Sequence, residues 1–177
     1  MIRQQVGRYR LARGMLFVFL IGAGCSPPVW GLKPIYPEPA LLRETDNSFV
    51  FTPVSTRWPE FKWEAFPRGQ DLEAGHAGAG RKISEVTYEL KIWEEDRAFP
   101  GTFDPGHEFA EPGPLVYARS GLPKPHHRIA MGLKWRTNYF WTVRARFLLD
   151  GQPRLTTWGV LGMPQSAVVS YYRFKTP

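Results

Sequence analysis

The histidines and nearby carboxylates are the first side chains in this sequence that could carry chemistry. His126 and His127 are adjacent, and His107-Glu108 lies just after Asp104. Imidazole and carboxylate groups bind metals and act as general bases, so convergence of His107, His126 or His127 with a carboxylate would indicate a metal-dependent hydrolase. Adjacent strand residues point to opposite faces, however, and metal ligands must be held in place by neighbouring groups. We therefore predict solvated polar residues here, with no metal, no cofactor and no catalytic residue.

Common catalytic motifs are absent from the sequence. It contains no Gly-x-Ser-x-Gly nucleophile elbow, no phosphate-binding Walker loop and no dinucleotide fingerprint. We predict a protein that binds rather than catalyses, and a metal-dependent hydrolase is the weaker alternative.

The positive charge of the chain is concentrated at its N-terminus. The formal net charge is +7, and four arginines precede the first apolar run without any acid: Arg3, Arg8, Arg10 and Arg13. Removal of this leader would lower the net charge to about +3, because four basic residues would be lost. A nucleic-acid binder needs a basic patch in its folded part. The remaining charges are mixed in sign, so we predict no nucleic-acid partner.

A secretory signal precedes the only cysteine. The basic residues are followed by an apolar run over residues 15–21, by Gly22-Ala23-Gly24 and then by Cys25. This order is typical of a signal peptide, which we place at residues 1–24. The apolar run is shorter than the roughly 18–20 residues that span a bilayer, and a retained transmembrane anchor is the alternative.

The four residues that end in Cys25 resemble the cleavage box of bacterial lipoproteins. The resemblance implies that the Cys25 sulfur carries a diacylglyceryl group and that Cys25 is the first mature residue. The alternative is a stray cysteine at the end of a signal peptide. Each buried methylene contributes about 0.8 kcal/mol, so several acyl chains would hold the protein on its membrane. Ser26 follows where enterobacterial lipoproteins of the inner membrane have aspartate, which implies the outer membrane, facing the periplasm.

Prolines mark the chain after the cysteine. Lys33-Pro34 and Tyr36-Pro37-Glu38-Pro39 are preceded by a Ser-Pro-Pro run. Repeated proline favours extended, semi-rigid geometry. We therefore predict a lipid-anchored tether over residues 25–47 that lifts a domain of residues 48–177 off the bilayer.

Residues 48–177 alternate between apolar and polar side chains with a period of two. The clearest series runs through Val86, Tyr88, Leu90 and Ile92, and a longer one covers residues 139–149. Such alternation predicts half-buried strands, and Asp150-Gly151 predicts a hairpin turn. Further strands are expected near residues 48–53, 61–66, 115–118, 129–133, 155–158 and 171–175. The pattern predicts an all-β antiparallel sandwich of about seven strands.

Several segments resemble a fibronectin type III domain. Residues 59–64 resemble its second strand, residues 87–90 its third, and residues 133–145 its leucine, threonine and tyrosine spacing before a strand that ends in Val-Arg-Ala. The resemblance implies an immunoglobulin-like sandwich in which Tyr139 forms a tyrosine corner, with its hydroxyl bonded to upstream backbone. The implied structural core comprises Trp63, Tyr88, Leu133, Tyr139 and Trp141.

A long acidic loop over residues 94–114 contains three aromatic residues. Phe99, Phe103 and Phe109 are candidate binding residues, since exposed loop aromatics can anchor a partner. The alternative is that they fold back and cover a sheet edge.

Three tryptophans are further candidate binding residues. Trp93, Trp135 and Trp158 would form the stacking platform of a carbohydrate-binding module if two of their rings were coplanar and exposed. We predict instead a protein-binding or assembly module in the cell envelope, whose partners are envelope proteins or a polysaccharide.

The outward residues of the 139–149 strand are Phe140, Thr142, Arg144 and Arg146, with Glu89 and Lys91 expected on a neighbour. Cross-strand charge pairs contribute only about 0.2–1 kcal/mol each. We expect this face to be solvated, and a partner surface is the alternative.

Overall fold

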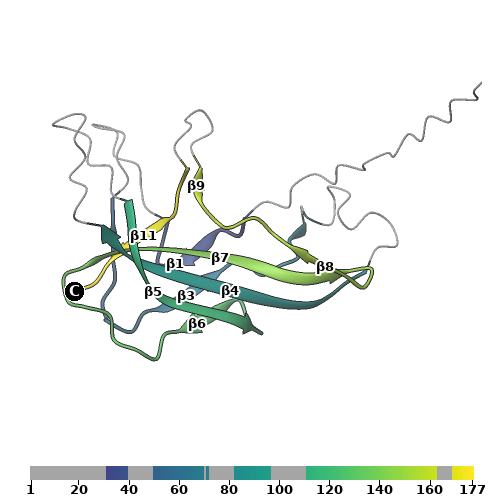
Figure 1. Cartoon of the computed structure of the whole chain (residues 1–177), viewed down its shortest axis with the longest axis horizontal. Coiled ribbons are helices and arrows are strands. Elements are labelled where there is room, and N and C mark those ends of the chain that lie inside the picture. Colours follow the sequence, from purple (N-terminus) through teal and green to yellow (C-terminus); the bar gives the residue numbers. More distant parts are fainter. Residues whose placement is uncertain (1–30, 40–49, 70, 72–81, 97–110, 163–168) are drawn as a thin grey trace, which may run out of the picture.

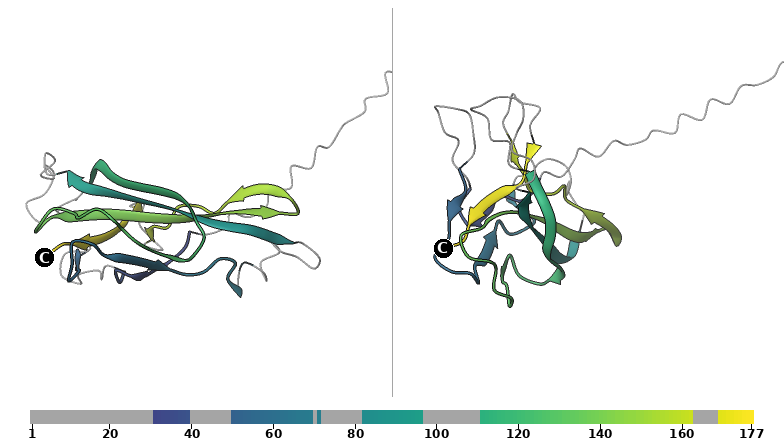
Figure 2. Two further views of the ribbon diagram at one scale, coloured as in Figure 1. Left: turned by 90° about the horizontal axis from the view of Figure 1, so that it is seen from below. Right: turned by 60° about the vertical axis from the view of Figure 1, so that its left-hand side comes forward.

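Two sheets lie one above the other in the computed structural model of this chain (Figures 1 and 2). The structure describes residues 31–39, 50–69, 71, 82–96, 111–162 and 169–177. The strands in these residues are β1 (Pro34–Tyr36), β2 (Thr52–Pro53), β3 (Glu60–Trp63), β4 (Ile83–Asp96), β5 (Glu111–Leu122), β6 (His126–Arg128), β7 (Asn138–Leu149), β8 (Gln152–Leu155), β9 (Leu161–Gly162), β10 (Val169–Ser170) and β11 (Tyr172–Lys175).

The strands form a β-sandwich-like, all-β arrangement. The smaller sheet has the order β1-β3-β6, and the larger has the order β2-β11-β7-β4-β5, with β8 also paired to β7. A separate two-stranded pair joins β9 and β10. The described residues thus contain eleven strands rather than the expected seven or so, because several are two-residue pairs and one sheet position is divided between two strands.

The long central strand β7 organises the larger sheet. One side of β7 pairs with β4 along almost its whole length. Its other side pairs with β11 near Asn138 and with β8 near Leu149, so that β8 and β11 share one position in the sheet. The chain that leaves β8 stays against β7, since the nitrogens of Thr156 and Gly159 donate to the carbonyls of Ala145 and Val143 at 3.0 and 2.9 Å.

Aromatic side chains fill the space between the two sheets. Trp63 of β3 and Trp141 of β7 are 1% and 0% exposed. The Phe61 ring meets the Trp141 ring edge-on with 4.9 Å between centroids, and the Trp63 ring meets the Tyr88 ring at 5.5 Å. Burial of one large apolar side chain contributes roughly 1.5–3 kcal/mol. The five residues expected in the core are all buried: Trp63, Tyr88, Leu133, Tyr139 and Trp141.

The outer face of β7 is covered at Phe140 and Thr142, where a solvated face was expected, while Arg146 remains 56% exposed. Phe140 and Thr142 have no exposed surface, and Glu89 of β4 is 6% exposed. The Thr142 hydroxyl donates to the Gly159 carbonyl at 2.6 Å, and the Phe51 ring packs edge-on against Phe140 at 5.5 Å. Segments outside β7 therefore cover the part of its second face that holds Phe140 and Thr142, which alternation along β7 alone does not reveal.

The expected strand over residues 129–133 is also wrong. The strand in this region, β6, ends at Arg128, and Met131 is 45% exposed. Ile129 and Leu133 are buried because their backbone nitrogens bond to the Pro59 and Arg57 carbonyls, at 3.4 and 3.0 Å. The alternation of apolar residues here marks a loop tied to the start of β3.

The predicted tether includes residues that belong to the fold. Leu32, Pro34 and Pro37 are buried, and β1 pairs with β3. We call residues 31–37 the N-terminal docking segment. These prolines lie against the smaller sheet because β1 adds a strand to it, so the sandwich includes residues well before the expected boundary at residue 48.

Candidate functional site

Three large apolar side chains gather at the surface near the C-terminus. Trp58, Met131 and Trp135 are 46%, 45% and 63% exposed. They belong to the loop before β3 and the loop before β7, which the backbone bond between Leu133 and Arg57 joins. We call Arg57, Trp58, Met131 and Trp135 the end patch. It lies at the end of the sandwich where the chain terminates and β7 begins (Figure 1).

Arg57 contacts both exposed indoles of the end patch. Its Cζ atom is 5.4 Å from the centroid of the Trp58 ring and 5.1 Å from that of the Trp135 ring. Its Nε atom donates to the Leu133 carbonyl, while the Leu133 nitrogen donates to the Arg57 carbonyl at 3.0 Å. Each exposed cation–π contact contributes about 0.5–1 kcal/mol. The guanidinium is therefore held in place by one backbone carbonyl and two rings.

The turn that carries Trp135 is tied to the C-terminal strand. The Thr137 nitrogen donates to the Thr176 hydroxyl at 3.0 Å, and that hydroxyl donates to the Lys134 carbonyl at 2.7 Å. The Arg136 nitrogen donates to the Pro177 carbonyl at 2.8 Å. These bonds fix the backbone on both sides of Trp135, so the indole is displayed from an ordered turn.

Tyr139 supports the same turn from the protein interior. Its ring is 1% exposed and stacks on Phe174 with 5.3 Å between centroids. Its hydroxyl accepts a hydrogen bond from the Lys134 nitrogen at 2.9 Å. Burial raises the pKa of Tyr139, so the neutral phenol persists at physiological pH.

The Trp58 indole packs closely against the backbone at Gly132. A Cβ atom on Gly132 would lie 3.0 Å from Cζ2 of the Trp58 indole. Glycine therefore lets the indole lie flat against the backbone of the 131–133 loop. The patch is held by glycine, by Arg57 and by the ordered turn, which reduces the conformational entropy that binding would remove.

The other two predicted binding tryptophans are half-buried and already have partners. The Trp93 ring stacks on Tyr171 with 4.9 Å between centroids and 10° between planes. The Trp158 ring lies under Arg144 and Lys91, whose Cζ and Nζ atoms are 4.2 and 4.9 Å from its centroid. Of the three candidate tryptophans, only Trp135 is exposed. The exposed pair of rings that the carbohydrate hypothesis required among these three is not observed.

Glu89 forms an ion network on the covered face of the larger sheet. Its carboxylate accepts from Arg144 Nε at 2.6 Å and from Arg146 Nη1 at 2.8 Å. Burial raises the pKa of Glu89, but the hydrogen bonds from Arg146 and Arg144 outweigh burial and leave the pKa below its usual value. All three charges are paired, so this network stabilises the sheet and offers no free acid or base.

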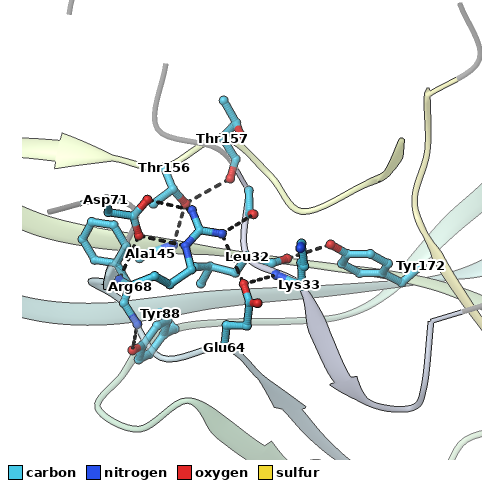
Figure 3. A network of polar contacts seen from close by, with 12 residues as sticks. Leu32, Lys33, Glu64, Arg68, Asp71, Tyr88, Ala145, Thr156, Thr157 and Tyr172 are labelled. Atoms are coloured by element: carbon cyan, nitrogen blue, oxygen red, sulfur yellow. Dashed lines mark hydrogen bonds and ion pairs between the residues drawn. The ribbon is translucent and has the colours of Figure 1, made fainter. Parts of the chain in front are cut away.

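A second polar network surrounds Arg68 (Figure 3). The Arg68 side chain is 10% exposed, and its Nε and Nη2 atoms donate to the two Asp71 oxygens, both at 2.8 Å. Its Nη1 atom donates to the Gly31 carbonyl at 3.1 Å and to Glu64 at 3.2 Å. The hydrogen bonds that Arg68 donates to Asp71 raise the pKa of Arg68 against the effect of burial. This cation therefore links a loop, the end of β3 and the chain entering the sandwich.

The same network fixes the N-terminal docking segment. Lys33 and Glu64 bond reciprocally: the Lys33 nitrogen donates to the Glu64 carboxylate at 3.3 Å, and the Glu64 nitrogen donates to the Lys33 carbonyl at 3.0 Å. From the other sheet, the Tyr172 hydroxyl donates to the Leu32 carbonyl at 2.7 Å. The segment is thus held by groups from both sheets, as Figure 3 shows.

The adjacent histidines point to different partners. His126 Nδ1 lies 3.2 Å from a Glu60 oxygen, whereas His127 Nε2 lies 2.6 Å from the Tyr117 hydroxyl. Burial, with the nearby charges of Arg119 and His126, lowers the pKa of His127. Among the residues that the structure describes, no three histidine, cysteine or acidic side chains could hold a metal ion.

Several predicted site residues lie outside the described residues: Cys25, Phe99, Phe103, Asp104, His107, Glu108 and Phe109. In the described ranges, no helix is long and apolar enough to cross a membrane.

Sequence reasoning missed most of the end patch. Trp135 was a candidate, but Arg57, Trp58 and Met131 were not. Met131 falls within the expected strand over residues 129–133, which is not observed. An available signal was the Arg57-Trp58-Pro59 run directly before a strand, because proline confines a preceding residue to extended or turn geometry.

Comparisons with known proteins add no relationship. No protein-family model matches the chain, and neither a curated protein nor a solved structure matches it. The functional argument therefore rests on the residues and their geometry.

Proposed function

We propose that this protein is a cell-envelope lipoprotein whose β-sandwich binds another envelope protein through the end patch. The observation that supports this most is the joint exposure of Trp58, Met131 and Trp135 around Arg57. Tryptophan, methionine and arginine are enriched at protein interfaces, and tryptophan and arginine dominate their binding energy.

We also propose a fibronectin type III-like architecture. The bond from the Lys134 nitrogen to the Tyr139 hydroxyl is the contact expected of a tyrosine corner. The burial of Trp63 and the pairing of a three-stranded sheet with a larger one support the same assignment. Such sandwiches serve many roles, so the binding function rests on the end patch and not on the fold.

The membrane anchor in this proposal is an acylated Cys25 in the outer membrane, facing the periplasm. Five residues separate Cys25 from Gly31, where the docking segment begins. Six extended residue steps reach about 20 Å at most, so the sandwich would sit close to the bilayer. Gly31 lies against Trp158 and Gly159, which is bonded to Val143. The end patch lies beyond Asn138, about 17 Å away along β7, so the start of the docking segment and the binding surface occupy different parts of the sandwich.

A carbohydrate ligand is the second candidate because Trp135 is 63% exposed. Sugars stack on open indole faces, yet Arg57 lies over a face of each exposed indole. Because the Arg57 guanidinium lies over these ring faces, a protein partner is favoured, since its side chains can contact ring edges as well as faces.

Site-specific photo-crosslinking in intact cells of the native host tests the function. A photo-crosslinking amino acid replaces Trp135 in one strain and Leu155, an exposed residue of β8, in another. We expect a discrete adduct with one envelope protein from position 135 and none from position 155. Equal adducts from both positions, or none from 135 together with selective binding on a glycan array, would reject the protein-binding function. Intact-mass analysis of the purified protein tests the anchor: residues retained ahead of Cys25, or an unmodified cysteine, would reject it.

A further inference from the structure

Two nitrogens of the Arg57 guanidinium are free to bind a ligand. Nε is occupied by the Leu133 carbonyl, and neither Nη1 nor Nη2 bonds to any residue in the described part of the chain. Two acids of neighbouring segments pair with lysines: Glu94 with Lys134 at 2.8 Å and Glu60 with Lys62 at 3.2 Å. The Pro177 carbonyl accepts from the Arg136 nitrogen at 2.8 Å, and no described acid forms an ion pair with Arg57. The end patch thus presents a positive charge without its own counterion.

We propose that the end patch recognises a carboxylate of its protein partner, an Asp or Glu side chain flanked by apolar residues. The carboxylate accepts hydrogen bonds from Nη1 and Nη2 of Arg57, and the flanking apolar side chains lie on Trp58, Met131 and Trp135. This proposal rests on the binding function proposed above and names the chemistry of the ligand.

Geometry makes Arg57 suited to a carboxylate. A guanidinium is planar and presents its donors as a rigid fork that matches the two oxygens of a carboxylate. Here the bond to Leu133 and the contacts with two indoles restrict the rotation of that fork before a ligand arrives. Neighbouring indoles also exclude water from a charge pair, which strengthens it.

The apolar surroundings favour an acidic peptide over an acidic sugar. Met131 is 45% exposed and adjoins Gly132, which lies against the Trp58 indole. Methionine is flexible and polarisable, and it adapts to apolar side chains of varied shape. A uronate offers a carboxylate but few apolar groups to cover Met131, whereas a peptide offers both.

The test follows the indole N–H signals of Trp58 and Trp135 by NMR, using the full mature protein in detergent micelles. Three probes are titrated: acetyl-Leu-Glu-Leu-amide, its neutral counterpart acetyl-Leu-Gln-Leu-amide, and an oligosaccharide of glucuronate. We expect the acidic peptide to shift both signals saturably, and the neutral peptide to bind at least about tenfold more weakly, since a charge-assisted hydrogen bond is lost. Added salt weakens the binding of the acidic peptide but not the binding of the neutral peptide.

Two variants and a control locate the effect. Arg57→Gln abolishes the preference for the acidic peptide, and Arg57→Lys retains only part of it because the fork is lost. Arg154→Gln, on the exposed strand β8, leaves it unchanged. Equal binding of both peptides, shifts with the oligosaccharide alone, or no shift with any probe would overturn the carboxylate proposal. If a photo-crosslinker at position 135 still captures a partner in any of these cases, the binding function stands and only its chemistry is wrong.

Discussion

The Tyr172 hydroxyl donates a 2.7 Å hydrogen bond to the carbonyl of Leu32, across 140 positions of sequence. Leu32 has no exposed surface, and Tyr172 is 3% exposed. This bond joins the last strand to the first described segment. It makes the docking segment, residues 31–37, part of the folded unit, although the sequence predicted that these residues belong to a tether.

Removal of that hydroxyl should destabilise the sandwich. Tyr172→Phe leaves the buried Leu32 carbonyl without its donor, which costs about 1–3 kcal/mol of unfolding free energy. Urea denaturation followed by tryptophan fluorescence measures the change. Tyr36→Phe is the control, since no hydrogen bond of the half-buried Tyr36 hydroxyl is observed in the described structure, and its effect should stay within about 0.5 kcal/mol. Equal stability of Tyr172→Phe and the parent protein would show that the bond is not formed.

A methyl group at Gly159 should separate the docking segment from the sandwich. Its Cβ would lie 2.5 Å from the Leu32 carbonyl oxygen and 2.8 Å from the Tyr172 ring. Gly159→Ala should therefore cost about 1–3 kcal/mol through overpacking and should speed amide hydrogen exchange in residues 31–37. Gly69→Ala is the matched control because nothing lies within 4 Å of the added atom. A Gly159→Ala protein as stable as Gly69→Ala would contradict the packing.

Asp71 should contribute more to stability than a surface acid. Asp71→Asn breaks the bidentate ion pair with Arg68, whose side chain is 10% exposed, and the loss of one partner of a buried pair costs about 3–5 kcal/mol. Glu64 still contacts Arg68, so we expect the lower end of that range. Glu60→Gln, which breaks an exposed pair with Lys62, should leave the urea midpoint almost unchanged. Similar midpoints for the two variants would show that the Arg68 network is not a stabilising feature.

His127 should make stability depend on pH. Burial lowers its pKa, helped by Arg119 and His126, so folding favours the neutral ring, whose Nε2 lies 2.6 Å from the Tyr117 hydroxyl. The unfolded chain takes up the proton first. Stability is therefore complete above the unfolded pKa of about 6.5 and declines as pH falls below it. His127→Gln should reduce the pH dependence of the unfolding free energy between about pH 7 and pH 5. An unchanged pH dependence would exclude His127 as its source.

The main strands could be predicted from sequence because their pattern is local. The alternation over residues 86–92 and 139–149 lies within β4 and β7, and Trp63 and Trp141 are enclosed between the sheets. The covering of Phe140 and Thr142 could not be predicted, because the covering groups come from the chain after β8 and from Phe51. The alternation of side chains along one strand cannot predict which distant segment will cover that strand.

The end patch was only partly predictable for the same reason. Trp135 was proposed from its residue type, but Trp58 lies in a loop far away in the sequence from the loop that carries Met131 and Trp135. A backbone bond between Arg57 and Leu133 brings these loops together. The burial of prolines in the docking segment could not be predicted either, because proline-rich segments occur both in linkers and at sheet edges.

Partner retention tests the central claim, that the end patch is the binding surface, most directly. The double variant Trp58→Ser, Trp135→Ser is compared with the parent protein and with a Leu155→Ser control, after each is shown to have the parent's urea midpoint. Each is purified from solubilised envelopes of the native host, and the co-purifying partner captured by crosslinking at position 135 is quantified by mass spectrometry. The end-patch account predicts at least a tenfold loss for the double variant, since each hot-spot truncation costs about 2 kcal/mol or more, and no loss for the control. Undiminished recovery by the double variant would contradict it.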